Sequence, residues 1–216
     1  MSEDMSLIVA IDGPAASGKS TVAKRLAAEL GIVFVSSGAM YRAFTWWVIE
    51  NDLDPAVTDA VEELLKKTEF KCGSENNIGT VEVAGHLPGR DQLSSEEVNN
   101  GVSAIAAIPS VRDRLVAEQR AHALRHGVVM EGRDIGSVVF PDTPHKFYID
   151  ASPEVRAQRR RAEGITDSIA ERDRKDSSRK TSPLVIPSDA TVVDSSFLTV
   201  DEVVQKVIER VRGLAD

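Results

Sequence analysis

The sequence predicts an α/β protein in which helices cover both faces of a central parallel sheet, giving three layers. Three observations predict this class. A short apolar run, a glycine-rich loop and a helical segment follow one another between Leu7 and Leu30. Further short apolar runs then alternate with helical segments, which is the order typical of a doubly wound sheet. Near the middle, closely spaced strand-like runs indicate a small β-containing insert.

Length and composition fit one domain of this class. A chain of 216 residues is long enough for one α/β domain with a substantial core. Charged residues make up 28% and hydrophobic residues 42%, which is ordinary for a globular protein. We therefore expect residues 1–216 to form a single domain, with an insert subdomain at about 68–92 and a helical lid at about 155–180.

Charge and cysteine content exclude several classes of protein. The net charge of −8 argues against a nucleic-acid-coating protein, which needs a basic surface. Cys72 is the only cysteine, so neither a disulfide framework nor a multi-cysteine metal site is expected.

The start of the chain is acidic and its first apolar run is too short for a signal or membrane helix. We expect a cytoplasmic protein without nucleic-acid or membrane partners, and a monomer by default.

The glycine-rich loop runs from Gly13 to Ser20 with the spacing G-x-x-x-x-G-K-S, between a strand and a helix. This is the context of a phosphate-binding loop, or P-loop. Gly13 and Gly18 allow a tight turn whose N–H groups face an anion, and the helix adds its positive end. Lys19 is expected to reach the β- and γ-phosphates and the Ser20 hydroxyl to bind Mg²⁺. The predicted ATP-binding residues are Gly13, Pro14, Ala15, Ala16, Ser17, Gly18, Lys19, Ser20 and Thr21.

The next two segments predict a strand at 32–35 and a helix that Ser37 caps and that runs through Ile49. Ligands of open α/β sheets bind at the carboxyl ends of strands. Ser37 and Arg42 are therefore expected near the site. The alternative, equally supported by spacing alone, is that Ser37 only caps the helix and Arg42 is solvated.

The middle of the chain predicts a helix at 57–68, followed by short strands at 70–72, 80–84 and 86–87. These strands form the predicted insert, which could wall off an acceptor or be decoration. Helices at 95–107 and 109–126 follow, with Ser103 and Arg112 near their junction. Arg112 shares its helix with three other arginines, which by default indicates a solvated face.

The strand predicted at 127–131 leads directly into Gly132-Arg133-Asp134. Charged side chains at a strand's carboxyl end indicate a site, because such groups seldom lie there without a partner. The alternative is a structural ion pair. A strand at 145–150 follows, and a helix begins at Ser152 and Pro153.

The predicted lid contains nine cationic and five acidic side chains between Arg156 and Lys180. Gly164 divides it into two helical pieces. Arg172, Asp176 and Arg179 are spaced so that they share one face of a helix. The alternative is an ordinary salt-bridged surface helix. A strand at 191–194 and a helix at 199–212 complete the chain.

The distribution of cations along the chain limits the reactions that a protein with this P-loop is expected to catalyse. The sequence has no Asn-Lys-x-Asp segment, which a GTPase uses to read guanine. A motor ATPase carries an acidic side chain at a strand end, whereas here we expect the strand ends to carry cations. Cations on several elements suit a second anion beside a triphosphate, which indicates phosphoryl transfer to a phosphate. Two unit charges about 4 Å apart repel by roughly 4 kcal/mol at an effective dielectric near 20. Arginine forks offset that repulsion, and an anionic acceptor oxygen needs no general base.

Six motifs, in the same order and over nearly the whole chain, resemble the bacterial cytidylate kinase family. They are Gly13–Thr21, Ser37–Arg42, Val111-Arg112, Glu131–Gly136 with Val138–Asp142, Arg172–Arg179, and Pro183-Leu184. The resemblance implies Mg²⁺-dependent transfer of the ATP γ-phosphoryl group to CMP or dCMP. It also implies a central parallel sheet, a β-containing insert on the monophosphate side and a mobile lid.

The resemblance also implies roles for individual residues. Ser37, Ser103, Arg112 and Asp134 would recognise cytosine or hold its pocket. Arg42 and Arg133 would bind the acceptor phosphate, Arg172 and Asp176 would engage the ribose side, and Arg179 would bind phosphate and assist transfer. The implied catalytic residues are Lys19, Arg133, Arg172 and Arg179.

Three features depart from the family pattern. Ser36 stands where the family more often has Asp, Ser94 where it often has Arg, and the lid between Arg161 and Arg172 is short. Two alternatives stay open on the residues alone. One is another P-loop kinase acting on UMP, dTMP or a metabolite such as shikimate, and the other is a nucleotide-binding protein without turnover.

Overall fold

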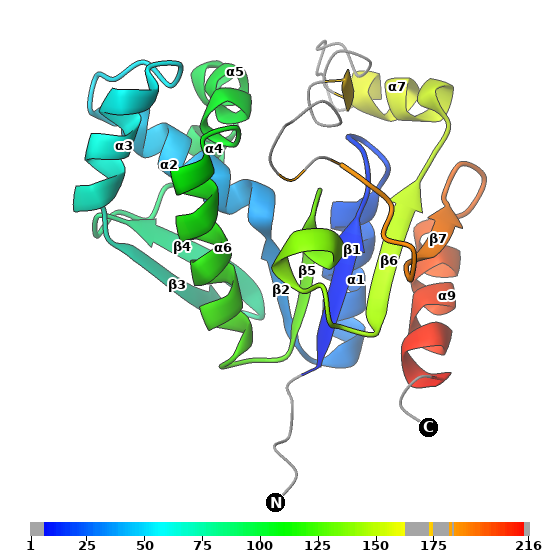
Figure 1. Cartoon of the computed structure of the whole chain (residues 1–216). Helices are drawn as coiled ribbons and strands as arrows, with labels where there is room; N and C mark the ends of the chain where they lie inside the picture. The colour runs from blue at the N-terminus through cyan, green and yellow to red at the C-terminus, as the bar shows by residue number, and fades with distance from the viewer. Residues whose placement is uncertain (1–6, 163–172, 175–181, 183, 214–216) are drawn as a thin grey trace, which may run out of the picture.

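The computed structural model describes residues 7–162, 173–174, 182 and 184–213. Its centre is a sheet of seven strands in the order β3-β4-β2-β5-β1-β6-β7 (Figure 1). The strands are β1 (Ile8–Asp12), β2 (Val33–Ser36), β3 (Phe70–Glu75), β4 (Ile78–Val83), β5 (Val128–Gly132), β6 (His145–Asp150) and β7 (Thr191–Asp194). All neighbouring strands run parallel except β3 and β4. The predicted α/β class with a central parallel sheet is confirmed.

Helices lie on both faces of this sheet. They are α1 (Lys19–Leu30), α2 (Ser37–Glu50), α3 (Thr58–Lys67), α4 (Arg90–Leu93), α5 (Glu96–Ile105), α6 (Pro109–Ala123), the π-helical turn η1 (Ile135–Val139), α7 (Pro153–Ala162) and α9 (Val200–Gly213). Helices α1 and α9 share one apolar core, and α2, α3, α5 and α6 share another. Within the described residues, no helix combines the length and apolar character that a membrane span requires.

The central strands contribute side chains to both cores, which explains their nearly continuous apolar sequences. Val9 and Ile11 of β1 face the core beneath α1 and α9, while Ala10 faces the opposite core. On β5, Val129 faces the first core and its neighbours Val128 and Met130 face the second. The predicted three-layer arrangement therefore follows from the alternation of side chains along each strand.

The predicted β-containing region is a hairpin that extends the central sheet. Its turn is formed by Asn76 and Asn77, both with positive φ (50° and 59°), as tight hairpin turns require. Strand β4 pairs with β2 through Phe34 and Ile78, so the hairpin continues the sheet at that edge. The strand expected at 86–87 is wrong, because His86 forms only an isolated bridge to Val83. The assignment of residues 68–92 as an insert subdomain stays a prediction.

Most of the predicted lid lies outside the described residues, and Arg172, Asp176 and Arg179 are among the residues not described. The described part consists of α7 and of Asp173 and Arg174. Figure 1 shows α7 at the carboxyl end of β6, on the opposite side of the P-loop from α3 and α5. The carboxyl ends of β1, β2 and β5 lie between these two sides.

Candidate active site

One cavity of about 360 Å³ joins the P-loop to the predicted acceptor residues at the carboxyl edge of the sheet. Its walls come from the P-loop, from the start of α2, from α5 and α6, and from the segment that follows β5. Among the predicted site residues, those that line it are Ala15, Ala16, Gly18, Lys19, Ser20, Thr21, Ser37, Arg42, Ser103, Arg112, Arg133 and Asp134. Residues more than 100 positions apart therefore meet at one site.

The P-loop owes its path to two glycines. A Cβ atom on Gly13 would lie 2.1 Å from the carbonyl oxygen of Ile149, so only glycine fits against β6. Gly18 has a φ of 87° and caps α1 in the left-handed conformation. The sequence predicts a helix from Val22 to Leu30, and α1 begins three residues earlier, at Lys19. The N–H groups of its first turn, which have no partner within a helix, therefore lie at the cavity.

Cationic side chains bind four carbonyl groups of the P-loop. The donors and acceptors are Arg133 to Gly13 (3.1 Å), Lys19 to Pro14 (3.0 Å), Arg156 to Ala15 (3.3 Å) and Arg159 to Ser17 (3.1 Å). In a trans peptide the N–H points away from the preceding C=O. Because the α7 arginines bind the carbonyls that precede Ala16 and Gly18, the N–H groups of these two residues point away from α7. Ala16 and Gly18 both line the cavity.

Sequence reasoning missed this role of α7. Arg156 is buried, and besides the Ala15 carbonyl it contacts Ala151 and the carboxylate of Asp173 (2.6 Å). Arg159 also binds the hydroxyl and the carbonyl of Ser195. The spacing of three residues, which places both arginines on one face of α7, is the signal that could have found them.

Two acidic side chains also lie at the carboxyl ends of strands, so the expectation that these ends carry cations rather than an acid is wrong. Asp12 accepts hydrogen bonds from the N–H groups of Ile135 and Gly136, each at 2.7 Å. Burial raises the pKa of Asp12 to about 6, although these two N–H groups act in the opposite direction. Glu131 accepts a hydrogen bond from the Ser36 hydroxyl at 2.5 Å, and its other oxygen lies 4.0 Å from Lys19 Nζ.

On the acceptor side, Arg112 and Asp134 form a buried ion pair. Arg112 is only 3% exposed, so the default expectation of a solvated position is wrong. Its guanidinium also donates to the Ala106 carbonyl (3.0 Å) and lies 5.5 Å from the centre of the Tyr41 ring. Arg112 Nε is buried with no hydrogen-bond partner among the described residues, although other parts of this side chain line the cavity.

Arg133 and Asp134 serve different partners although they are adjacent in sequence. Arg133 donates to the Gly13 carbonyl, and Asp134 pairs with Arg112. The partner of Asp134 is thus on α6 rather than its neighbour in sequence. The segment after β5 thereby contacts the P-loop with one side chain and the acceptor side with the next.

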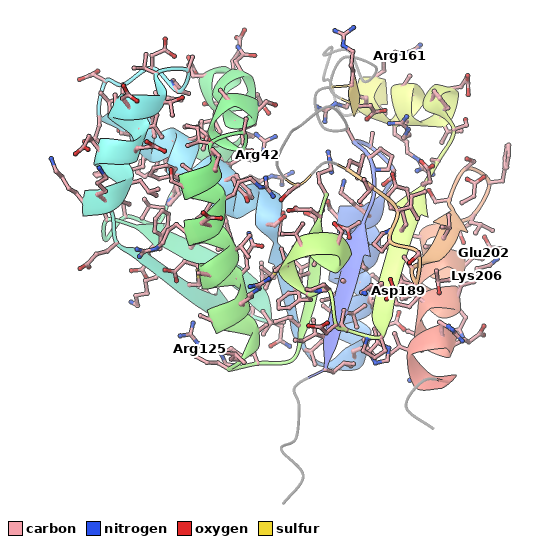
Figure 2. The ribbon with its side chains drawn as sticks, in the orientation of Figure 1. Arg42, Arg125, Arg161, Asp189, Glu202 and Lys206 are labelled. Atoms are coloured by element: carbon pink, nitrogen blue, oxygen red, sulfur yellow. The ribbon has the colours of Figure 1, made fainter. Side chains whose placement is uncertain are left out.

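The start of α2 presents further predicted residues to the cavity. Ser36, not Ser37, caps the helix by accepting a hydrogen bond from the Ala39 N–H (3.4 Å). Ser37 is the first helical residue and is buried in the cavity wall. Arg42 extends from α2 toward α5, as Figure 2 shows, and donates to the Asn99 side chain (2.8 Å) and the Leu93 carbonyl (3.2 Å).

The cavity contains oxygen donors that fit Mg²⁺. Ser20 and Glu131 both line it, and a hydroxyl and a carboxylate are ligand types that Mg²⁺ accepts beside phosphate oxygens and water. In the part of the chain that the structure describes, no group of three or more His, Cys, Asp or Glu side chains could hold a metal without such help. The donor set therefore fits a metal that arrives with a nucleotide.

A sequence model of the cytidylate kinase family matches residues 9–213. The chain belongs to the cytidylate kinase family. The cytidylate kinase of Streptomyces avermitilis is 41% identical over 94% of this chain and 91% of its own length. That of Streptococcus pneumoniae strain 70585 is 42% identical over 92% of this chain and 94% of its own length. The predicted family and the prediction of a phosphotransferase are confirmed.

A solved structure supports the fold at greater distance. The crystal structure of TT1252 from Thermus thermophilus is 18% identical to this chain, covers 99% of it and all of its own length, and has a TM-score of 0.50. At that identity the similarity concerns the fold alone. The roles of individual cytidylate kinase residues in this chain, including those outside the described ranges, stay predictions.

Proposed function

We propose that this chain transfers the γ-phosphoryl group of ATP to CMP or dCMP and produces ADP with CDP or dCDP. The observation that carries this proposal is the single cavity shared by the P-loop and the buried Arg112–Asp134 pair. The P-loop suits the triphosphate of a donor nucleotide, and the buried polar pair suits the base of an acceptor. Because both line one cavity, the two substrates would meet between the loop and the pair.

On the donor side, the P-loop binds the phosphates of ATP. The N–H groups of the loop and of the first turn of α1 donate to phosphate oxygens, and Lys19 adds a charge. Lys19 now donates to the Pro14 carbonyl, so its ammonium group already lies at the loop. Ser20 and Glu131 would hold Mg²⁺, which supplies neutralisation of charge on the β- and γ-phosphates.

On the acceptor side, the chemistry of the Arg112–Asp134 pair suits cytosine. Cytosine presents an amino donor at N4 beside acceptors at N3 and O2, so a carboxylate and a guanidinium can bind this edge together. Uracil has a carbonyl oxygen in place of the amino group, and that oxygen would face the Asp134 carboxylate. We assign discrimination between CMP and UMP to this repulsion, with Ser37 and Ser103 completing the pocket.

Arginines supply the charge that transfer between two phosphates requires. Arg42 and Arg133 line the cavity between the P-loop and the base pocket, where they would bind the acceptor phosphate. Their planar forks match phosphate oxygens, and they offset the repulsion between the two anions. The acceptor oxygen is already anionic, so positioning and charge neutralisation carry the reaction without a general base. Arg172, Asp176 and Arg179 are proposed to complete the site from the lid.

The proposal is tested by ADP formation from Mg-ATP with CMP, dCMP, UMP, AMP, GMP and dTMP in separate reactions. We expect kcat/KM for CMP and dCMP to exceed that for UMP by at least a hundredfold, since a misplaced buried hydrogen-bonding group costs about 1–3 kcal/mol and two such groups change between the bases. Asp142→Asn, an exposed change near the same segment, is the control. Equal turnover of CMP and UMP, or turnover of neither, would refute the proposal.

Two further properties belong to the same proposal. We expect the chain to act as a monomer and to work in the cytoplasm, where ATP is available. Sedimentation velocity at working concentration tests the first property. Activity that appears only above a concentration threshold would contradict it.

A further inference from the structure

Asn99 on α5 contacts Arg42 at the edge of the cavity. Its side-chain oxygen accepts a hydrogen bond from Arg42 Nη1 at 2.8 Å, and the same guanidinium nitrogen lies 3.2 Å from the Leu93 carbonyl oxygen. We propose that Asn99 is a positioning residue that sets the direction of Arg42 toward the acceptor phosphate. This inference rests on the proposed function, which assigns the acceptor phosphate to Arg42.

The hydrogen bonds of Asn99 fix which way its amide points. The amide nitrogen donates to the carbonyl groups of Ser94 (2.8 Å) and Ser95 (2.9 Å), so both of its hydrogens are used. Carbonyl groups only accept and a guanidinium only donates, so a flipped amide would lose all three bonds. The amide therefore connects the α4–α5 junction to Arg42 in a single orientation.

The neutral charge of Asn99 matters for its role. Arg112 is held by the carboxylate of Asp134, which suits recognition of an uncharged base. Arg42 is directed by an amide that orients a cation without cancelling its charge, which suits a phosphate dianion. An aspartate at position 99 would meet the Ser94 and Ser95 carbonyls without hydrogens to donate, and it would compete with phosphate for Arg42.

Ser94 contributes to this arrangement through its backbone carbonyl, while its hydroxyl bonds elsewhere. The sequence has Ser94 at a position where family members often have an arginine, and here Ser94 provides a carbonyl for Asn99 and turns its hydroxyl back to Arg90. The α4–α5 junction thus orients an arginine that α2 supplies. Positioning of Arg42 is the function that these contacts serve.

The first test is Asn99→Ala, with Asn100→Ala as the matched control. Asn100 is exposed, lies on the same helix and does not line the cavity. We expect Asn99→Ala to raise KM for CMP about tenfold, because misdirecting one charge-assisted hydrogen bond loses about that factor in affinity. KM for ATP, the melting temperature and the inhibition constant of cytidine, which has no phosphate, should each stay within twofold of wild type.

A residue that only held the α4–α5 junction together would change those other quantities as well. Weaker cytidine inhibition together with a lower melting temperature would therefore overturn the proposal, as would an unchanged KM for CMP. If wild-type protein fails to turn over CMP, the proposed function fails instead. The two failures are thus separated by the wild-type assay.

Two more variants connect Asn99 to Arg42 specifically. In the Arg42→Ala background, Asn99→Ala should have no further effect on KM for CMP, since it would act through a side chain that is gone. Additive effects of the two changes would contradict the inference. Asn99→Asp keeps the shape of the side chain, so it serves if the alanine variant folds poorly. It should raise KM for CMP at least as much as alanine, and wild-type affinity would refute the positioning role.

Discussion

The donor side and the acceptor side of the cavity use arginine in different ways. At the P-loop, Arg133, Arg156 and Arg159 donate to backbone carbonyls, and the two α7 arginines thereby orient peptide units whose N–H groups belong to cavity-lining residues. On the acceptor side, Arg112 and Arg42 are held by the side chains of Asp134 and Asn99. Under the proposed function, the phosphates of the donor would thus be bound largely by backbone groups and the acceptor largely by side chains. Substitutions on the donor side should therefore change the kinetic constants for ATP, and substitutions on the acceptor side those for CMP.

Replacement of Lys19 by methionine should have the largest effect on the donor side. It removes the ammonium group beside the phosphates, and kcat should fall about a thousandfold, the loss typical of removing one well-placed charged donor. Lys24→Met on the exposed face of α1 is the control. The measurement is ADP formation at saturating CMP. A fall below tenfold would show that backbone donors alone suffice at this loop.

Asp134→Ala should have the largest effect on the acceptor side. It leaves Arg112 buried without its carboxylate, which should lower the free energy of unfolding by about 3–5 kcal/mol and raise KM for CMP. Urea denaturation and steady-state kinetics measure the two effects. KM for ATP should not change, and a matching change in both Michaelis constants would break the division between the sides.

Asp12 connects the two sides, because it ends β1 and binds N–H groups next to Asp134. Its pKa is raised to about 6 in the folded protein, above its usual value near 4. The folded state then binds this proton more readily than the unfolded state does. The contribution of Asp12 to stability is therefore greatest below about pH 4 and falls as pH rises to about 6, by up to about 3 kcal/mol.

Urea denaturation of wild type and Asp12→Asn across pH 4 to 7 measures this contribution. The free energy of unfolding of wild type, taken relative to the variant, should decrease over that range. Parallel curves would show that the Asp12 carboxyl titrates normally. A relative increase would show that the two N–H groups outweigh burial.

Arg159→Ala should have the smallest effect of the four. Loss of its contact with the Ser17 carbonyl should loosen the P-loop and raise KM for ATP about tenfold, while KM for CMP stays the same. Arg161→Ala is the control, since Arg161 is exposed at the end of α7 (Figure 2). A change in KM for CMP alone would place α7 on the acceptor side.

The donor side could be predicted from the sequence because its determinants lie within eight consecutive residues. The spacing from Gly13 to Ser20 constrains a turn and a helix start that local chemistry dictates. The same is true of the alternating strands and helices, whose apolar periodicity is local. Local differences from prediction are the exact start of α1 and the capping role of Ser36, whereas the contacts of α7 with the P-loop and the acidic strand ends depend on distant segments.

The acceptor side could not be predicted in this way. Arg112 is buried because Asp134 lies beside it in space, and helical spacing gives no sign of a partner 22 residues away. Asn99 was missed for the same reason, as were Glu131 and the donor-side Arg156, since each acts on a distant segment. The resemblance to cytidylate kinases, and not periodicity, placed Arg112, Ser103 and Asp134 in one pocket.

The position of β5 has a consequence for how the enzyme is made. Strands β1 and β2 are consecutive in the chain but are not neighbours, because β5 enters between them and pairs with both. Val128 pairs with Ile8, so this contact closes a very long loop and is expected to form slowly. A nascent chain that has emerged only as far as α6 carries the whole P-loop and still lacks the floor of the cavity. We therefore expect nucleotide binding to begin only after β5 has also been synthesised and has paired with β1 and β2.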